Sequence, residues 1–296
     1  MTTTKYLYIP MIALLANLLA GCAFLISTPQ SHGIEDVIFP TPSSTVEPDL
    51  SSARPSTTDM PTEQTPDSTD ITGQHPFYSE RAKRDYLLFL PDTYGEDPQK
   101  DWPLIIFLHG SGVRGDNVHN LKYEALPQIL EFVPEFPFIV ISPLLTDESG
   151  DELWTTEKVV SSLLIILEEV QAEYAVDPNR IYLTGVSLGG NGTWEIGLRY
   201  PDRFAALVPV MGFYGNTTTA RVPDNICDLK DVPVWAFHGA KDHIVPLFAE
   251  EELVDALKAC GGKVQFTIYP DGDHDVSGQT YMNTDLYEWL QNQSLK

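Results

Sequence analysis

Short apolar runs alternate with longer amphipathic stretches along the chain from about residue 77. Residues 104–108, Leu-Ile-Ile-Phe-Leu, are apolar without interruption, which is typical of a strand buried on both faces. The alternation predicts an α/β fold, in which a mostly parallel central sheet is flanked by helices and carries no large lid domain. The predicted strands cover residues 85–90, 103–108, 138–142, 180–185, 204–210, 232–237 and 263–269, and the predicted helices cover residues 156–174, a stretch ending near 200, 247–259 and 285–291.

The N-terminal stretch has a different pattern. Residues 6–20 are mostly apolar behind a single basic residue, Lys5, and are shorter than the roughly 20 residues that span a membrane. This predicts a signal peptide over residues 1–21. The sequence Leu-Ala-Gly-Cys ending at Cys22 resembles the lipobox of bacterial lipoproteins, which implies that Cys22 becomes the lipid-modified first residue. An ordinary secretory signal and an uncleaved anchor are the alternatives.

Residues 22–76 are predicted to form a disordered tether. Of the fifty residues from 27 to 76, 8 are Pro and 17 are Ser or Thr, and Phe39 is the only aromatic residue. Such a segment buries too little apolar surface to offset its conformational entropy. The expected organisation is a signal peptide, a lipid-anchored tether and one folded domain over 77–296, held outside the cytoplasm at a bacterial membrane.

Charge and cysteine content narrow the possible partners. The net charge is −24, which argues against binding to nucleic acid because the phosphates would be repelled. Besides Cys22 the chain has only Cys227 and Cys260. In an oxidising compartment these two cysteines could form a disulfide, or they could remain free thiols.

The sequence Gly-Val-Ser-Leu-Gly over residues 185–189 joins a predicted strand to a predicted helix. A sharp turn of this kind exposes the serine hydroxyl at the edge of the sheet and allows two backbones to approach closely at the glycines. By itself the pattern is common enough to arise by chance. In this context it predicts that Ser187 is a nucleophile.

A serine nucleophile needs a base, and the base needs an acid to orient it. His274 follows the last predicted strand and is the last histidine in the chain, while Asp242 follows the preceding strand. The order Ser187, Asp242, His274, with each residue after a strand, is that of α/β-hydrolases. Three neighbours of the base, Asp271, Asp273 and Asp275, could compete with Asp242 but are less suited to reach its ring.

Two backbone N–H groups are needed to bind the oxyanion of an acyl-transfer reaction. One is expected from Leu188, directly after the nucleophile, and the other from Ser111, in the glycine-flanked loop after the strand at 103–108. A phosphate-binding loop at 109–112 is excluded because no Lys-Ser or Lys-Thr pair follows it.

Residues 80–292 resemble the α/β-hydrolase family of exported esterases and peptidases that includes feruloyl esterase-like, acetylxylan esterase-like and polyhydroxybutyrate-depolymerase-like proteins. The matching stretches are residues 108–116, 177–190, 232–242 and 273–275. Val113 stands where such sequences often carry Glu, and Ser277 where a Trp often follows the His-Asp pair. The resemblance implies the α/β-hydrolase fold and no metal or organic cofactor.

Aromatic residues near the same edge of the sheet could form a substrate pocket. Trp154 is the first candidate to line it, ahead of Trp194 and Phe213, although aromatic side chains at such positions are often part of the core.

The sequence therefore predicts a membrane-tethered serine hydrolase that cleaves carboxylic esters, with feruloyl or acetyl groups on polysaccharide fragments as the expected substrates. A prolyl-oligopeptidase-like serine peptidase would use the same residues, because only the leaving group differs. A surface binding protein that retains the fold without its chemistry is the third possibility.

Overall fold

The computed structural model describes residues 72–146, 153–215 and 221–296. The predicted signal peptide, Cys22 and the tether up to residue 71 lie outside the described residues. Within these three ranges, no helix has the length and apolar character that crossing a membrane requires.

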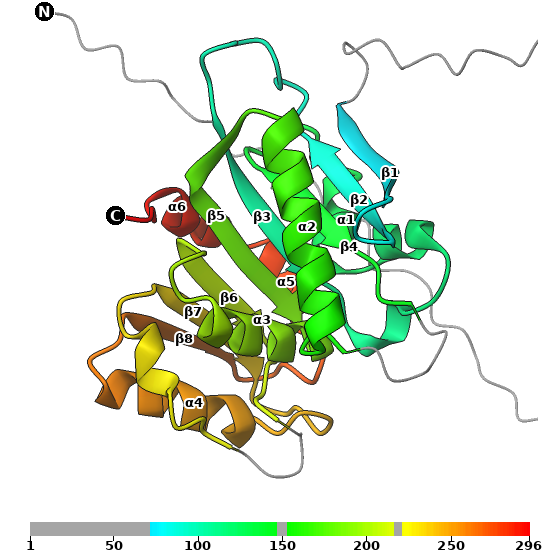
Figure 1. Cartoon of the computed structure of the whole chain (residues 1–296). Helices are drawn as coiled ribbons and strands as arrows, with labels where there is room; N and C mark the ends of the chain where they lie inside the picture. The colour runs from blue at the N-terminus through cyan, green and yellow to red at the C-terminus, as the bar shows by residue number, and fades with distance from the viewer. Residues whose placement is uncertain (1–71, 147–152, 216–220) are drawn as a thin grey trace, which may run out of the picture. The chain divides into compact units, whose positions relative to one another are not determined.

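A single sheet of eight strands forms the centre of the structure, in the order β1-β2-β4-β3-β5-β6-β7-β8 (Figure 1). The strands are β1 (Gly73–Ser79), β2 (Arg84–Leu90), β3 (Trp102–Leu108), β4 (Ile139–Pro143), β5 (Val176–Val186), β6 (Ala206–Val210), β7 (Val234–Gly239) and β8 (Val264–Tyr269). Strand β2 pairs antiparallel with both β1 and β4, and every other pairing is parallel. The predicted mostly parallel sheet is confirmed.

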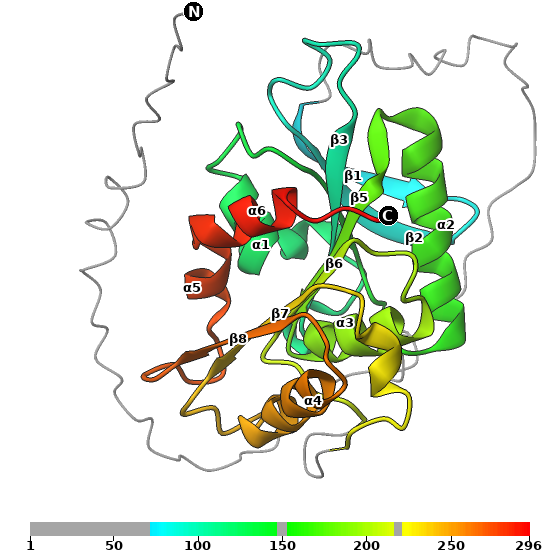
Figure 2. The ribbon, with the colours of Figure 1, turned by 90° about the vertical axis from the view of Figure 1, so that its left-hand side faces the viewer.

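Helices cover both faces of this sheet, as the edge-on view in Figure 2 shows. One face carries α2 (Glu157–Glu173), α3 (Leu188–Arg199) and α4 (Phe248–Ala259), and the other carries α1 (Ala125–Leu130), α5 (Ser277–Tyr281) and α6 (Thr284–Gln291). Two large apolar clusters correspond to these two layers. Because both faces are covered, every residue of β3 is buried, which explains its uninterrupted apolar sequence.

The structure starts earlier than the sequence pattern indicates. Strand β1 begins at Gly73, so the predicted tether boundary at residue 76 is wrong by four positions. The strand lies at the edge of the sheet and pairs with β2 through its backbone. Because only two of its side chains are buried, it lacks the apolar pattern that marks the other strands.

Two short helices, α1 and α5, also lack a clear sequence signal. Each is shorter than two full turns, and a helix of that length has too few positions to display an apolar stripe.

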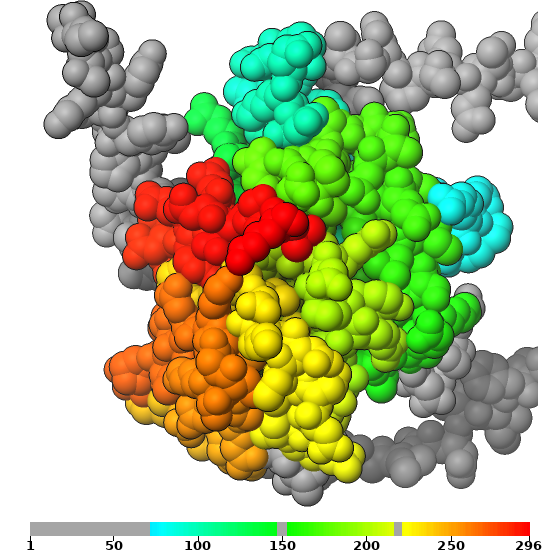
Figure 3. Space-filling model, turned by 60° about the vertical axis from the view of Figure 1, so that its left-hand side comes forward, coloured from blue at the N-terminus to red at the C-terminus, as the bar shows by residue number. Residues whose placement is uncertain are grey.

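The C-terminal segment closes the layer that contains α6. After this helix the chain returns to β5, where the Tyr182 hydroxyl donates to the carbonyl of Gln293 at 2.9 Å and the N–H of Leu295 donates to the carbonyl of Asn179 at 2.9 Å. Figure 3 shows these last residues in red, packed directly beside the green and orange parts of the chain.

A disulfide joins Cys227 to Cys260, with 5.4 Å between their Cα atoms. Cys227 lies in the short 3-10 helix Ile226–Leu229, and Cys260 caps the C-terminal end of α4. The bridge therefore ties α4 to the segment that precedes β7.

Replacing both cysteines with serine (Cys227→Ser with Cys260→Ser) should lower the free energy of unfolding by about 3–4 kcal/mol, because the bridge closes a long loop and restricts the unfolded chain. Urea titration followed by tryptophan fluorescence measures the difference, with reduced wild-type protein as the control. Peptide mapping that finds both thiols free in unfolded, non-reduced protein would contradict the bridge.

Candidate active site

The candidate site lies where several parallel strands end at the same edge of the sheet. Ser187 follows β5, Asp242 follows β7 and His274 follows β8. Since the carboxyl ends of parallel strands meet at one edge, loops that are distant in sequence converge there.

Ser187 occupies a strained turn between β5 and α3. Its φ is 54° and its ψ is −111°, a region that residues other than glycine rarely adopt. The N–H of Ser187 donates to the carbonyl of Val210 at 3.0 Å, and the N–H of Asn191 donates to the carbonyl of Ser187 at 2.9 Å. A Cβ atom at Gly189 would overlap the carbonyl oxygen of Leu108, so the first turn of α3 can approach β3 only with glycine there.

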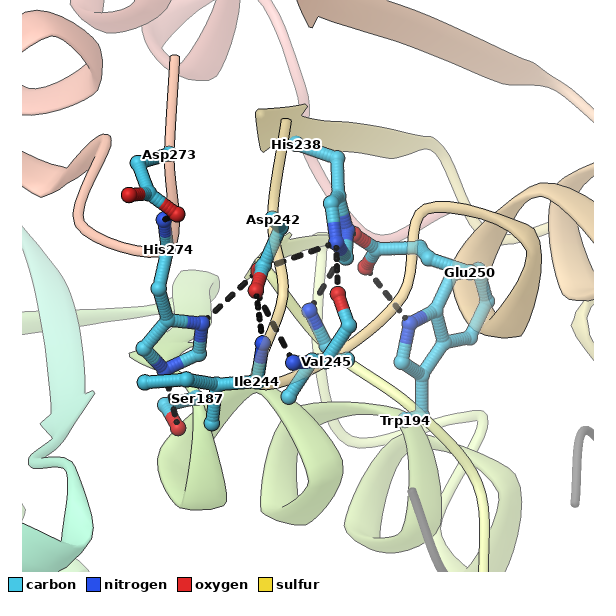
Figure 4. A network of polar contacts seen from close by, with 10 residues as sticks. Ser187, Trp194, His238, Asp242, Ile244, Val245, Glu250, Asp273 and His274 are labelled. Carbon is cyan, nitrogen blue, oxygen red and sulfur yellow. Dashed lines mark hydrogen bonds and ion pairs between the residues drawn. The ribbon is translucent and has the colours of Figure 1, made fainter. Parts of the chain in front are cut away.

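The three predicted residues form a continuous line of hydrogen bonds (Figure 4). His274 Nε2 lies 3.0 Å from Ser187 Oγ, and His274 Nδ1 lies 2.7 Å from Asp242 Oδ2. The His274 side chain is 19% exposed, whereas that of Asp242 is fully buried. The hydroxyl thus points at one nitrogen of an imidazole whose other nitrogen is held by a buried carboxylate.

The three competing aspartates bind elsewhere. Asp271 forms an exposed ion pair with Lys241, and Asp273 accepts the backbone N–H of His274 rather than contacting its ring. Asp275 accepts both the N–H and the hydroxyl of Ser277. Asp242 is therefore the carboxylate that holds the His274 ring.

Asp242 is held from several sides. Its Oδ1 accepts the N–H groups of Ile244 at 2.8 Å and Val245 at 2.9 Å. Burial favours the neutral carboxyl, but the hydrogen bonds from His238, His274 and these two N–H groups outweigh burial and lower the pKa of Asp242 below its usual range. Asp242 is consequently ionised and fixed in orientation.

The two predicted oxyanion donors lie at the starts of helical turns. Ser111 begins the 3-10 helix Ser111–Val113, and Leu188 begins α3. Across the described part of the chain, neither backbone N–H has a protein acceptor. Both groups are therefore available to a substrate oxygen.

His109 holds the loop that carries Ser111. Its Nδ1 lies 2.6 Å from the carbonyl of Gly110, and its Nε2 accepts the N–H of Leu145 at 3.0 Å. Since Nε2 is an acceptor, Nδ1 carries the proton and the ring is neutral. Burial supports this assignment by lowering the pKa of His109 to about 4.

Trp154 does not line a substrate pocket, so that prediction is wrong. Its side chain is fully buried, its indole N–H donates to the carbonyl of His109 at 2.9 Å, and its ring meets the His109 ring edge-on. Trp194 is also fully buried and donates to Glu250 at 3.0 Å. Because each indole N–H donates to a buried acceptor, both rings can lie in the core without leaving a polar group unpaired.

Glu124 is a residue that sequence reasoning missed. Its Oε1 accepts the N–H of Gly110 at 3.3 Å, and its Oε2 is buried without a partner among the described residues. Burial raises the pKa of Glu124 to about 7, although the Gly110 N–H acts in the opposite direction. The following residue, Ala125, has a φ of 46°. No motif marks this position, because the contact depends on the path of the chain between β3 and α1.

His238 and Glu250 were also missed. Both are fully buried, and they form a hydrogen-bonded pair directly behind Asp242. In the sequence, only the His-Gly pair at the end of β7 marks His238, and no motif marks Glu250. Within the described ranges, no group of three or more His, Cys, Asp or Glu side chains could hold a metal ion.

Comparison with known sequences points to esterases. The model of the Phospholipase/Carboxylesterase family matches residues 146–292. The chain is 25% identical over 225 residues to an Escherichia coli (strain K12) protein named "Putative carboxymethylenebutenolidase", with 71% of this chain and 79% of that protein aligned. It is also 25% identical over 213 residues to the bifunctional acetylxylan esterase/xylanase XynS20E of Neocallimastix patriciarum, covering 70% of this chain and 28% of that protein.

Solved structures agree. A thermostable esterase has a TM-score of 0.60 and 29% identity, with 76% of this chain and 64% of that one covered, so the match spans less than two thirds of that enzyme. A ferulic acid esterase has a TM-score of 0.55 at 18% identity, covering 73% of this chain and 94% of that one, and this likeness is evidence for the fold alone. The chain has the α/β-hydrolase fold, and its family match and relatives support an ester hydrolase.

Proposed function

We propose that this protein is a serine hydrolase that cleaves carboxylic esters through an acyl-enzyme at Ser187. The observation that carries the proposal is the line of hydrogen bonds from Ser187 through His274 to the buried Asp242. A histidine placed between a serine in a strained turn and an ionised carboxylate has the geometry of a catalytic base, which a histidine with only a structural role does not require.

In the first half of the reaction, Ser187 Oγ attacks the ester carbonyl carbon while its proton passes to His274 Nε2. Asp242 accepts the Nδ1–H and stabilises the imidazolium that forms. The carbonyl oxygen, which gains the electron pair of the C=O π bond, is bound by the N–H groups of Ser111 and Leu188. Collapse of this intermediate breaks the bond to the alcohol, which leaves with the proton from His274.

In the second half, water attacks the acyl-enzyme and gives a proton to His274 Nε2. The tetrahedral intermediate is bound by the same two N–H groups and collapses to release the carboxylic acid, while Ser187 Oγ regains its proton from His274. The enzyme returns to its starting state, and one water is consumed for each ester bond cleaved.

The proposed substrates are acyl or aryl esters such as feruloyl and acetyl groups on polysaccharide fragments. The acetylxylan esterase relative and the thermostable esterase support an ester substrate. The carboxymethylenebutenolidase name suggests cyclic esters as a related class to include in any test.

The proposed location follows from the N-terminal sequence. We propose that the signal peptide is removed, that Cys22 is lipid-modified, and that the Pro/Ser/Thr-rich tether displays the catalytic domain outside the cytoplasm. Metabolic labelling with an alkyne fatty acid would test this, since Cys22→Ala should abolish incorporation.

The substrate class can be tested on the purified full-length chain with p-nitrophenyl acetate and butyrate, methyl ferulate, acetylated xylan and an aminoacyl anilide. Turnover of ferulate or acetylxylan would support polysaccharide de-esterification. Anilide turnover with poor ester rates would favour a peptidase. Covalent labelling by a fluorophosphonate without turnover would leave the serine chemistry standing and reject the substrate class.

Ser187→Ala should lower kcat for p-nitrophenyl acetate by at least about 10³-fold, because the attacking oxygen is lost. It should also abolish fluorophosphonate labelling. Ser294→Ala, which changes an exposed serine in the C-terminal tail, is the matched control and should behave as wild type. Undiminished turnover by Ser187→Ala, with an unchanged circular dichroism spectrum, would refute the assignment.

Asp242→Asn should lower kcat by about 10³–10⁴-fold, because an amide cannot stabilise the imidazolium and can hold His274 in the wrong tautomer. Asp271→Asn is the matched control, since that carboxylate lies in the same loop as His274 but pairs with exposed Lys241. Equal losses in the two variants would show that general loop damage, rather than the Asp242–His274 contact, limits the rate.

A further inference from the structure

The proposed reaction does not use the buried pair behind Asp242. His238 lies on β7 and Glu250 lies on α4, and both side chains are fully buried. His238 Nδ1 lies 2.7 Å from Glu250 Oε2, and His238 Nε2 lies 2.9 Å from the carbonyl of Val245 and 3.3 Å from Asp242 Oδ2. Figure 4 shows this second histidine on the side of Asp242 away from His274.

The hydrogen-bonding partners determine the charge of His238. A neutral imidazole has one N–H donor and one bare nitrogen that accepts. Here the Nε2 atom faces a carbonyl and a carboxylate, which only accept, and Nδ1 faces a second carboxylate. Both ring nitrogens therefore carry a proton, and the ring is an imidazolium.

Glu250 is the counter-charge. Its Oε1 accepts the indole N–H of Trp194 at 3.0 Å, and its Oε2 accepts the N–H of Gly212 at 3.1 Å. Hydrogen bonds from N–H donors to both oxygens of a carboxyl favour its charged form. The Glu250 carboxylate is therefore the group placed to compensate the positive charge of His238, whose burial would otherwise be costly.

The pKa of His238 agrees with a protonated ring. Burial of the ring lowers the pKa of His238, but the hydrogen bonds to Asp242 and Glu250 outweigh burial and raise it to about 10. Thus His109 and His238, which both end strands in a His-Gly sequence, have opposite protonation states near neutral pH.

We propose that His238 and Glu250 form a buried ion pair that positions Asp242, and that the separate charges of its two members set the pH range in which His274 works as a base. This inference rests on the proposed function and deepens it. His238 and Glu250 are positioning residues, since neither can reach the substrate or the reacting atoms except through Asp242.

The direction of the effect follows from charge. The His238 imidazolium attracts the same oxygen, Asp242 Oδ2, that binds His274. It therefore weakens the negative potential that Asp242 exerts on the His274 ring, and removing this positive charge should have the opposite effect.

In the described part of the chain, the carboxylates that contact His238 or His274 are those of Asp242, Glu250 and Asp273. Asp242 and Glu250 face His238, and Asp242 and Ser187 contact the His274 ring. Asp273 accepts the backbone N–H of His274.

The test is the pH dependence of kcat/KM for p-nitrophenyl acetate on the full-length chain. His238→Gln removes the positive charge and should move the acid limb of the profile to higher pH by about one pH unit, the order expected for loss of a nearby unit charge. Glu250→Gln removes the negative charge but leaves one amide oxygen that can accept from His238 Nδ1, and should move the limb to lower pH. Trp194→Phe breaks a hydrogen bond to Glu250 without changing charge, and should leave the limb in place.

Shifts of the acid limb in opposite directions in these two variants would indicate an effect of charge. A loss of packing alone would not shift the limb to higher pH in one variant and to lower pH in the other. An acid limb that stays in place in His238→Gln, or that moves in the same direction in both charge variants, would overturn the proposal. Wild-type protein without Ser187-dependent ester turnover would instead refute the proposed function.

A measurement on the wild-type protein keeps the inference testable if a variant does not fold. In ¹⁵N-histidine-labelled protein, both ring nitrogens of His238 should have the chemical shifts of an imidazolium from pH 6 to about pH 9. A neutral His238 ring at pH 7 would overturn the proposal, whether or not the protein hydrolyses esters.

Discussion

The strained backbone at Ser187 is the constraint on which the rest of the site depends. A positive φ at a residue with a Cβ costs of order 1–3 kcal/mol and persists only when its surroundings hold it. Here the N–H of Ser187 is bound by β6, its carbonyl caps α3, and Gly189 lets that helix lie against the end of β3. In this turn the Ser187 hydroxyl lies against His274, and the N–H of Leu188 has no acceptor among the described residues, so the proposed nucleophile and one proposed oxyanion donor come from the same turn.

Two His-Gly sequences at the ends of β3 and β7 show how surroundings decide chemistry. His109 accepts the N–H of Leu145, so it is neutral and holds the loop that carries the proposed oxyanion donor Ser111. His238 meets acceptors at both ring nitrogens, so it is charged and lies against Asp242. The residue type, the neighbouring glycine and the place at the strand end are alike, and the difference comes from backbone and side-chain groups that are distant in sequence.

Most of the architecture could be predicted because buried positions require apolar residues, and these recur with the spacing of the strand or helix that carries them. Strands covered on both faces, such as β3, must be apolar throughout, and α2 needs an apolar stripe to pack on them. The pattern did not reveal β1, α1 or α5, since an edge strand with two buried side chains and helices shorter than two turns leave little trace. The prediction that Trp154 lines a pocket was wrong for a related reason. An aromatic residue near the site looks the same in the sequence whether it lines a pocket or lies in the core.

The sequence by itself determined the alternation of strands and helices, the turn at Ser187, and the order in which Ser187, Asp242 and His274 follow their strands. Those features are local, because each depends on residue types at fixed spacing along the chain. Only the tertiary structure decided that Asp242 contacts the His274 ring and that the three aspartates in the His274 loop do not. It also placed Glu124, His238 and Glu250 around the site. These contacts join segments far apart in the chain, and their energies depend on which donor meets which acceptor once water is excluded.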